Sequence, residues 1–122
     1  MEILLKRLAT YKQCLHGRLY IEGDHVCDTL EQVGDCLAPG LHRIIQLGGK
    51  RVCRKENVAS FYAANGPYAL PRGGVAVGEW KYLGFLIHCA DYYEPLVERL
   101  RMARNRGKWL MLRIEDAVTV EV

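Results

Sequence analysis

Cysteine and histidine stand in two close pairs near the start of the sequence, Cys14 with His16 and His25 with Cys27. Alternation along a strand puts the members of each pair on one face, and both residue types are common zinc ligands. The pairs fall on opposite arms of one expected hairpin. If its turn is at 23–24, they lie roughly 13 Å apart along the ladder, too far for one tetrahedral ion. We therefore expect core or surface roles for these side chains and no metal site.

A second candidate is the adjacent pair His88 and Cys89, at the end of an expected strand over 84–89. A histidine beside a thiol suggests an activated nucleophile. Neighbouring side chains of a strand point to opposite faces, however, so the two cannot be partners there. We expect Cys89 to be a buried small apolar residue. The glycine clusters at 48–49 and 73–78 match no phosphate-binding loop and no dinucleotide fingerprint, so we predict no catalytic residue and no cofactor.

Positive charge is concentrated near the end of an expected helix, in a basic patch of Arg99, Arg101, Arg104, Arg106 and Lys108. Such a density could contact phosphate groups. Cations at a helix C-terminus also complement the helix dipole, and Glu98 can pair with Arg101. We favour this structural interpretation, which makes nucleic acid an unlikely partner.

The elements that would position these residues are mostly strands. Alternation predicts a first strand over 2–8, a hairpin of 15–21 with 26–30 that sets Tyr20 opposite Cys27, and a second hairpin of 41–47 with 50–54. In the second hairpin Ile44 would face Cys53. Further strands are expected at 58–62, 75–80, 84–89 and 109–114. No helical spacing interrupts this pattern before residue 90.

One helix is predicted over 91–106, from a capping-box pattern of Asp91 with Glu94 to a stop at Gly107. Pro95 is tolerable in it only near the first turn. Together the elements predict a single α+β domain over 1–122, a mostly antiparallel sheet or small barrel with one helix packed on it.

Composition sets wide bounds on function. The 122 residues are half hydrophobic and a quarter charged, with a net charge of +3, so no global field points to nucleic acid or lipid. Five cysteines, an odd number without a CxxC pair, predict reduced thiols and a cytoplasmic protein. The first residues resemble neither a signal peptide nor a membrane anchor.

A resemblance to a known family rests on segments 5–7, 17–23, 27–31, 37–42, 77–79 and 93–100, taken in order. The sequence Cys-Asp-Thr-Leu-Glu at 27–31 is the most specific of them. Together they resemble a family of small uncharacterised bacterial and phage-related proteins, common in Bacteroidetes and classed as a domain of unknown function. The resemblance implies a bacterial or phage-related origin.

Members of that family carry a histidine segment and, later, a Gly-Cys-Ile segment, an arrangement similar to the His and Cys of L,D-transpeptidases. Aligned with this chain, the cysteine falls on Gly74 and the histidine near Ala63. Glycine supplies no nucleophile and alanine no base. The resemblance therefore implies that residues needed for such chemistry are missing here.

The long connection from 56 to 74 interrupts the strand pattern, and connections of this length are often functional. We take the stretch 63–80 as a contact loop, with candidate residues Asn65, Tyr68, Arg72, Glu79 and Trp80. The leading hypothesis is a non-catalytic binding domain whose partner is a protein or a cell-wall peptide. Two alternatives stay open, an enzyme acting on peptidoglycan peptides and a nucleic-acid binder using the basic patch.

Overall fold

The structure, a computed structural model, describes residues 1–46 and 58–121. Its strands are β1 (Ile3–Tyr11), β2 (Cys14–Ile21), β3 (Asp24–Gln32), β4 (Gly40–Gln46), β5 (Val58–Ala63), β6 (Gly74–Tyr82), β7 (Phe85–Ile87) and β8 (Met111–Glu121). A 3-10 turn, η1 (Val33–Asp35), follows β3, and the helix α1 (Cys89–Asn105) precedes β8. The predicted β-rich α+β class is confirmed.

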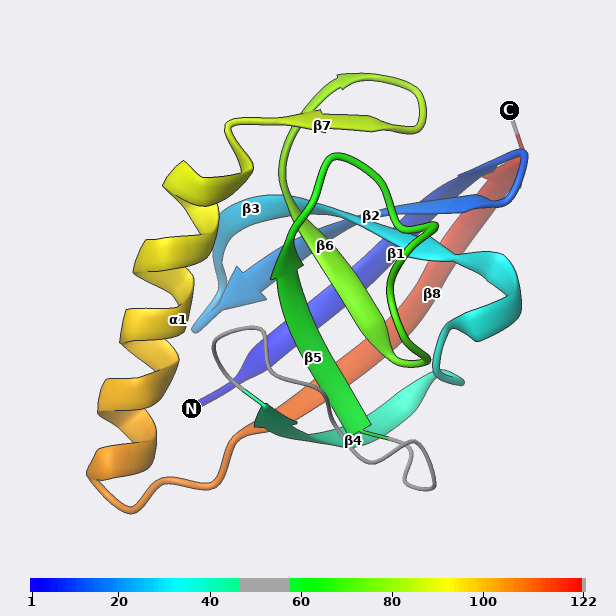
Figure 1. Cartoon of the computed structure of the whole chain (residues 1–122). Coiled ribbons are helices and arrows are strands. Elements are labelled where there is room, and N and C mark those ends of the chain that lie inside the picture. Colours follow the sequence, from blue (N-terminus) through cyan, green and yellow to red (C-terminus); the bar gives the residue numbers. More distant parts are fainter. Residues whose placement is uncertain (47–57, 122) are drawn as a thin grey trace.

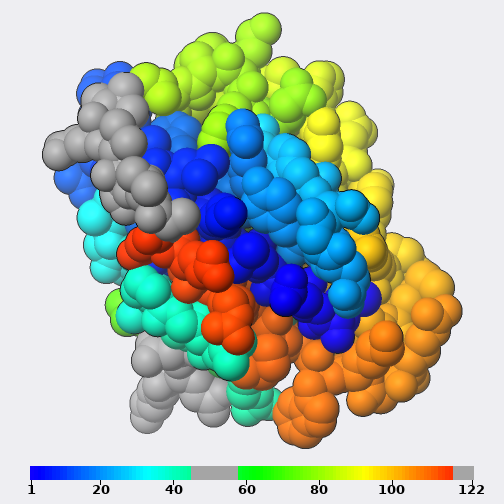
Figure 2. Space-filling model, turned by 180° about the vertical axis from the view of Figure 1, so that it is seen from behind, coloured from blue at the N-terminus to red at the C-terminus, as the bar shows by residue number. Residues whose placement is uncertain are grey.

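Seven of the described strands close into a barrel in the order β3, β2, β1, β8, β4, β5, β6 and back to β3 (Figure 1). Three contacts are parallel, namely β1 with β8, β4 with β5, and β5 with β6, and the other contacts among described strands are antiparallel. β7 lies outside the barrel beside β6. Figure 2 shows β1 (blue) flanked by β2 (lighter blue) and β8 (red). Closure leaves the seven barrel strands without a free edge.

The β2–β3 hairpin turns one residue earlier than predicted. Glu22 and Gly23 form the turn, with φ of 51° and 86°, because a two-residue turn of the hairpin type needs positive φ at both positions. A bulge in β3 then shifts the register again. Cys27 therefore lies opposite Leu19, and the predicted pairing of Cys27 with Tyr20 is wrong.

α1 begins at Cys89, two residues before the predicted start. His88 is the N-cap residue, with a left-handed φ of 53°, so Asp91 lies in the first turn and is not the cap. Pro95 lies inside the helix and not near its first residues, which removes the N–H that would bond to the carbonyl of Asp91. The predicted stop at Gly107 is confirmed by its φ of 78°. Among the described residues no helix is both long and apolar enough to cross a membrane.

Two apolar clusters hold the described residues together. The larger joins the barrel to α1, which packs against β3, β5 and β6 and lies at one end of the barrel (Figure 1). The smaller lies beneath β7 and consists of Cys14, Leu30, Ala76 and Leu86. Alternation along β6 explains the division, since Val75 and Val77 belong to the first cluster and Ala76 to the second.

A buried ion pair accompanies this core. Arg7 of β1 donates to both carboxylate oxygens of Glu31 of β3, at 3.0 and 2.8 Å, and to the carbonyl of Leu37 at 2.7 Å. Asp116 of β8 lies 3.5 Å from the same guanidinium. Burial raises the pKa of Glu31, and Arg7 opposes this shift only in part. Burial alone would lower the pKa of Arg7, but the hydrogen bond and charge of Glu31 raise it.

The second predicted hairpin lies largely outside the described residues, since its turn at 48–49 and its return strand at 50–54 are not among them. The arm that is described is β4. Ile44 of β4 pairs with Ala59 of β5, and its N–H donates to the carbonyl of Leu110 at 3.1 Å.

Candidate functional site

The five residues predicted for a contact loop lie on two consecutive parts of the chain, the connection between β5 and β6 and β6 itself. The connection between β5 and β6 is residues 64–73, and Glu79 and Trp80 belong to β6. Asn65 connects this segment to β7 through two hydrogen bonds. Its side-chain amide donates to the backbone carbonyl of Leu86 at 2.8 Å, and its backbone carbonyl accepts the Leu86 N–H at 2.8 Å. Glu79 accepts a hydrogen bond from the hydroxyl of Tyr92 at 2.8 Å. Asn65 and Glu79 therefore connect elements of the fold.

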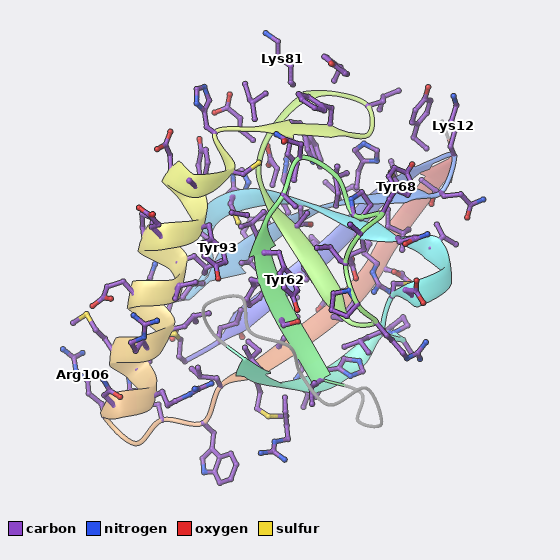
Figure 3. The ribbon with its side chains drawn as sticks, in the orientation of Figure 1. Lys12, Tyr62, Tyr68, Lys81, Tyr93 and Arg106 are labelled. Carbon is purple, nitrogen blue, oxygen red and sulfur yellow. The ribbon has the colours of Figure 1, made fainter. Side chains whose placement is uncertain are left out.

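Tyr68 and Arg72 lie at the surface of the same connection. Tyr68 is 58% exposed, with its hydroxyl 3.0 Å from Sγ of Cys14. This hydrogen bond raises the pKa of Tyr68. Figure 3 shows Tyr68 on the side of the molecule where Lys12 projects, away from Arg106. Of the predicted loop residues, Trp80 is the one that lines a described pocket.

That pocket, which we call the Trp80 pocket, is an apolar hollow of about 430 Å³ lined by Leu8, Ala9, His16 and residues 80–83. β-bulges interrupt two of the strands that frame it, at 7–9 of β1 and 80–82 of β6. Bulges redirect side chains and are frequent beside binding sites. At its rim, Tyr82 is 63% and Leu83 44% exposed. The pocket thus combines an apolar wall with exposed apolar side chains.

His16 anchors the β6–β7 hairpin over this pocket. Its Nε2 accepts the backbone N–H of Gly84 at 2.8 Å, so the ring proton belongs on Nδ1. Burial lowers the pKa of His16, and an interaction with the backbone of Cys14 opposes this shift only in part. At neutral pH His16 is therefore an uncharged hydrogen-bond acceptor.

Trp80 is held from several sides. Its backbone N–H donates to Asp28 at 3.0 Å and its indole N–H to the carbonyl of Thr29 at 3.4 Å. The ring meets His16 edge to face, with centroids 5.7 Å apart, and the Arg18 guanidinium lies 5.3 Å from its centre. This wall of the pocket is consequently preorganised.

The predicted basic patch is divided around α1. Arg101 lies 3.6 Å from Glu98, as predicted, and Arg99 lines a small depression between α1 and the β2–β3 hairpin. Arg106 is the C-cap residue, exposed at the end of the helix (Figure 3). Arg104 and Lys108 reach a different place, a hollow of about 490 Å³ that also includes Arg43 and Trp109. We call it the Trp109 hollow.

Gly74 and Ala63, the two positions that the resemblance aligns with a cysteine and a histidine, are separated in the barrel. Gly74 pairs with Ser60 and Ala63 pairs with Val77, so the two positions stand three residues apart along parallel strands. A Cβ at Gly74 would lie 2.8 Å from both the Leu70 Cβ and the Pro71 carbonyl oxygen. The adjoining connection therefore has its present shape because residue 74 is glycine.

Burial disfavours the thiolate form of three described cysteines. Burial raises the pKa of Cys27 to about 12, and burial also raises the pKa of Cys36 and of Cys89. Cys89 was wrongly placed in a strand, since β7 ends at Ile87, and it is half-buried with Sγ 3.3 Å from the carbonyl of Ala64.

The cysteine–histidine pairs of β2 and β3 stand at opposite ends of their hairpin. Cys14 pairs with Gln32 beside one end, and His25 pairs with Tyr20 beside the other. Across the described part of the chain no group of three or more metal-ligating side chains converges.

Reasoning from the sequence did not single out Arg43, Tyr82, Leu83 or Trp109. Trp109 could have been noticed, because it follows the basic run directly and precedes the last strand.

The fold and its pockets define a small mixed β-barrel with surface hollows at two ends. Comparisons of the chain with protein-family models, curated proteins and solved structures find no match.

Proposed function

We propose that the chain is a non-catalytic binding domain for another protein, and that the Trp80 pocket receives an apolar side chain of that partner. The observation that carries the proposal is the apolar pocket with Tyr82 and Leu83 exposed at its rim. Contiguous exposed apolar groups around a hollow are typical of protein-binding surfaces, where a few buried anchors supply most of the affinity.

The surroundings of the pocket support this role. Tyr82 stacks on Phe85 with ring centroids 5.1 Å apart, and the hairpin that carries both rings is fixed by the bond from Gly84 to His16. Tyrosine is enriched at interfaces because it combines a large apolar face with a polar tip. Lys81, which projects at this end in Figure 3, adds a charge to the rim.

The test is to select peptides from a displayed random library on the wild-type protein and to measure their affinity for three variants. Leu83→Glu places a charge at the rim, and Ala9→Leu fills the pocket. Leu41→Glu is the matched control, because Leu41 is an exposed leucine on β4, outside the residues that line the pocket. We expect selected peptides to share an apolar anchor and to bind both pocket variants about tenfold more weakly, with no change for the control.

Circular dichroism of each variant checks that the fold is kept. Peptides that bind wild type and both pocket variants equally well would overturn the proposal, as would a library that yields no binder.

A further inference from the structure

The Trp109 hollow lies where three elements meet, at the C-terminal end of α1, the start of β8 and the described end of β4. Arg104 reaches it from α1, Arg43 from β4, and Lys108 and Trp109 from the connection between α1 and β8. In Figure 2 this connection (orange) projects beside the end of β4 (green). The site is separate from the Trp80 pocket, since Arg106 and Lys81 lie at opposite ends of the molecule (Figure 3).

Hydrogen bonds fix the backbone on both sides of Trp109. The N–H of Lys108 donates to the carbonyl of Ala103 at 3.1 Å and that of Gly107 to the carbonyl of Arg104 at 2.9 Å. This pair of bonds is the Schellman motif, which ends a helix through a glycine of positive φ. On the other side Leu110 is buried, and its carbonyl accepts the N–H of Ile44. Trp109 therefore projects from a backbone that is anchored at both ends.

The charges of the described residues that line the hollow have one sign. Between residues 99 and 114 the sequence contains six Lys or Arg and no Asp or Glu. Within the described residues no carboxylate lines the hollow. The helix dipole accounts for cations on α1, but Arg43 belongs to β4 and adds positive charge that the dipole does not explain. The hollow is thus suited to an anion.

Arg104 is oriented toward this site by a hydrogen bond from its guanidinium to the carbonyl of Ile44, at 3.4 Å. A guanidinium has five N–H donors in a fixed plane, so this bond helps to orient the group at the hollow.

Trp109 distinguishes this hollow from a simple anion site. Its side chain is 77% exposed, the highest value among the exposed large apolar residues of the described chain. An indole beside three cations can stack on a planar ring while the cations hold a phosphate. An acidic peptide would use the cations and leave the indole without a role.

We propose that the Trp109 hollow binds a nucleotide unit, with its phosphate on Arg43, Arg104 and Lys108 and its base stacked on Trp109. The volume of about 490 Å³ is ordinary for a site of this kind. The same chemistry belongs to a free nucleotide and to one residue of a single strand, and the experiment below separates the two.

The experiment measures binding of a fluorescent oligothymidylate of eight residues across a range of salt concentrations. Three cation contacts to a single strand predict a slope of log affinity against log salt of about −2. Trp109→Ala should lower the affinity about tenfold and keep that slope, and Trp109→Phe should restore most of the loss. Lys108→Gln should make the slope shallower by about 0.7. Arg101→Gln is the matched control, since Arg101 pairs with Glu98, and it should change neither quantity.

Competition with thymidine monophosphate and with polyglutamate identifies the ligand. Displacement by the monophosphate at the same concentration of nucleotide units indicates a free nucleotide, and much weaker displacement indicates a single strand. Each outcome supports the proposal. Undiminished affinity of Trp109→Ala, equal competition by polyglutamate, or no binding of either nucleotide probe would overturn it.

Discussion

His16 illustrates how burial turns a titratable side chain into a structural one. Its Nε2 accepts a hydrogen bond from the Gly84 N–H, a bond that the protonated ring cannot make. The same residue lines the Trp80 pocket and meets Trp80 edge to face. The charge state of one ring therefore affects both the hairpin and the proposed binding surface.

We expect the free energy of unfolding to fall as the pH drops below about 6.5. The folded pKa of His16 is lowered from 6.5, so between these values the unfolded chain takes up the proton first. Stability that is fully present above 6.5 is lost toward the folded pKa, with a slope of at most about 1.4 kcal/mol per pH unit. Urea unfolding between pH 5 and 8 measures how the free energy of unfolding changes with pH. We expect a shallower dependence for His16→Gln than for wild type.

His25→Gln is the control for that experiment, because His25 is exposed beside Asp28. If the slopes of wild type and His16→Gln agree, His16 does not carry the pH dependence.

At the scale of residues, the sequence showed which side chains could do chemistry but not what surrounds them. The expected hairpin register argued against His16 as part of a four-ligand zinc site. The bond of His16 to Gly84 could not be foreseen, because the two residues are 68 positions apart in the sequence. The prediction for Glu98 and Arg101 is confirmed since that pair is local to one helix.

At the scale of elements, strand positions and the local pairing of β2 with β3 were predictable, and long-range strand partners were not. Alternation located β1 and β2 to within a few residues, because each has one face in the core. β5 was also located to within a few residues, although its first four residues are buried on both faces. The turn of the β2–β3 hairpin was misplaced by one residue, since Glu22 adopts a positive φ that its residue type does not suggest. The start of α1 was missed for the same reason, as His88 also has positive φ.

The start of β6 offers a direct test of how closely one element fits its neighbour. A Cβ at Gly74 would stand 2.8 Å from two atoms of the preceding connection, whereas a Cβ at Gly66 would have no neighbour closer than 3.7 Å. We expect Gly74→Ala to cost about 1–3 kcal/mol of unfolding free energy through overpacking. Gly66→Ala should be close to neutral. Urea denaturation compares the two, and equal effects would show that the connection adapts freely.

At the scale of the whole molecule, the placement of β8 decides the architecture. The last strand enters between β1 and β4, pairing parallel with the first strand of the chain. Local sequence signals contain nothing about this contact, because it joins residues more than a hundred positions apart. The sequence therefore predicted a sheet or a barrel, and long-range packing selects the barrel.

Arg7 contacts two other strands of the barrel. It forms an ion pair with Glu31 of β3 and lies close to Asp116 of β8. Removing one partner of a buried ion pair leaves an uncompensated charge, which typically costs about 3–5 kcal/mol. We therefore expect Arg7→Met to lose about that much stability. Arg7→Met combined with Glu31→Leu should lose clearly less, because no charge of the pair stays buried.

The pair of Arg18 and Asp28, 3.9 Å apart, is the control between neighbouring strands of the same barrel, because the Arg18 side chain is 44% exposed. Arg18→Met should cost less than about 1 kcal/mol of unfolding free energy.

Urea unfolding of wild type, Arg7→Met, Glu31→Leu and the double variant gives the coupling energy between Arg7 and Glu31 directly. Because Asp116 stays exposed at 41%, water can solvate it when Arg7 is lost, so its contribution to the cycle should be small. A double variant as unstable as the sum of the two single ones would mean that Arg7 and Glu31 stabilise the barrel independently, and that the pair does not couple β1 to β3.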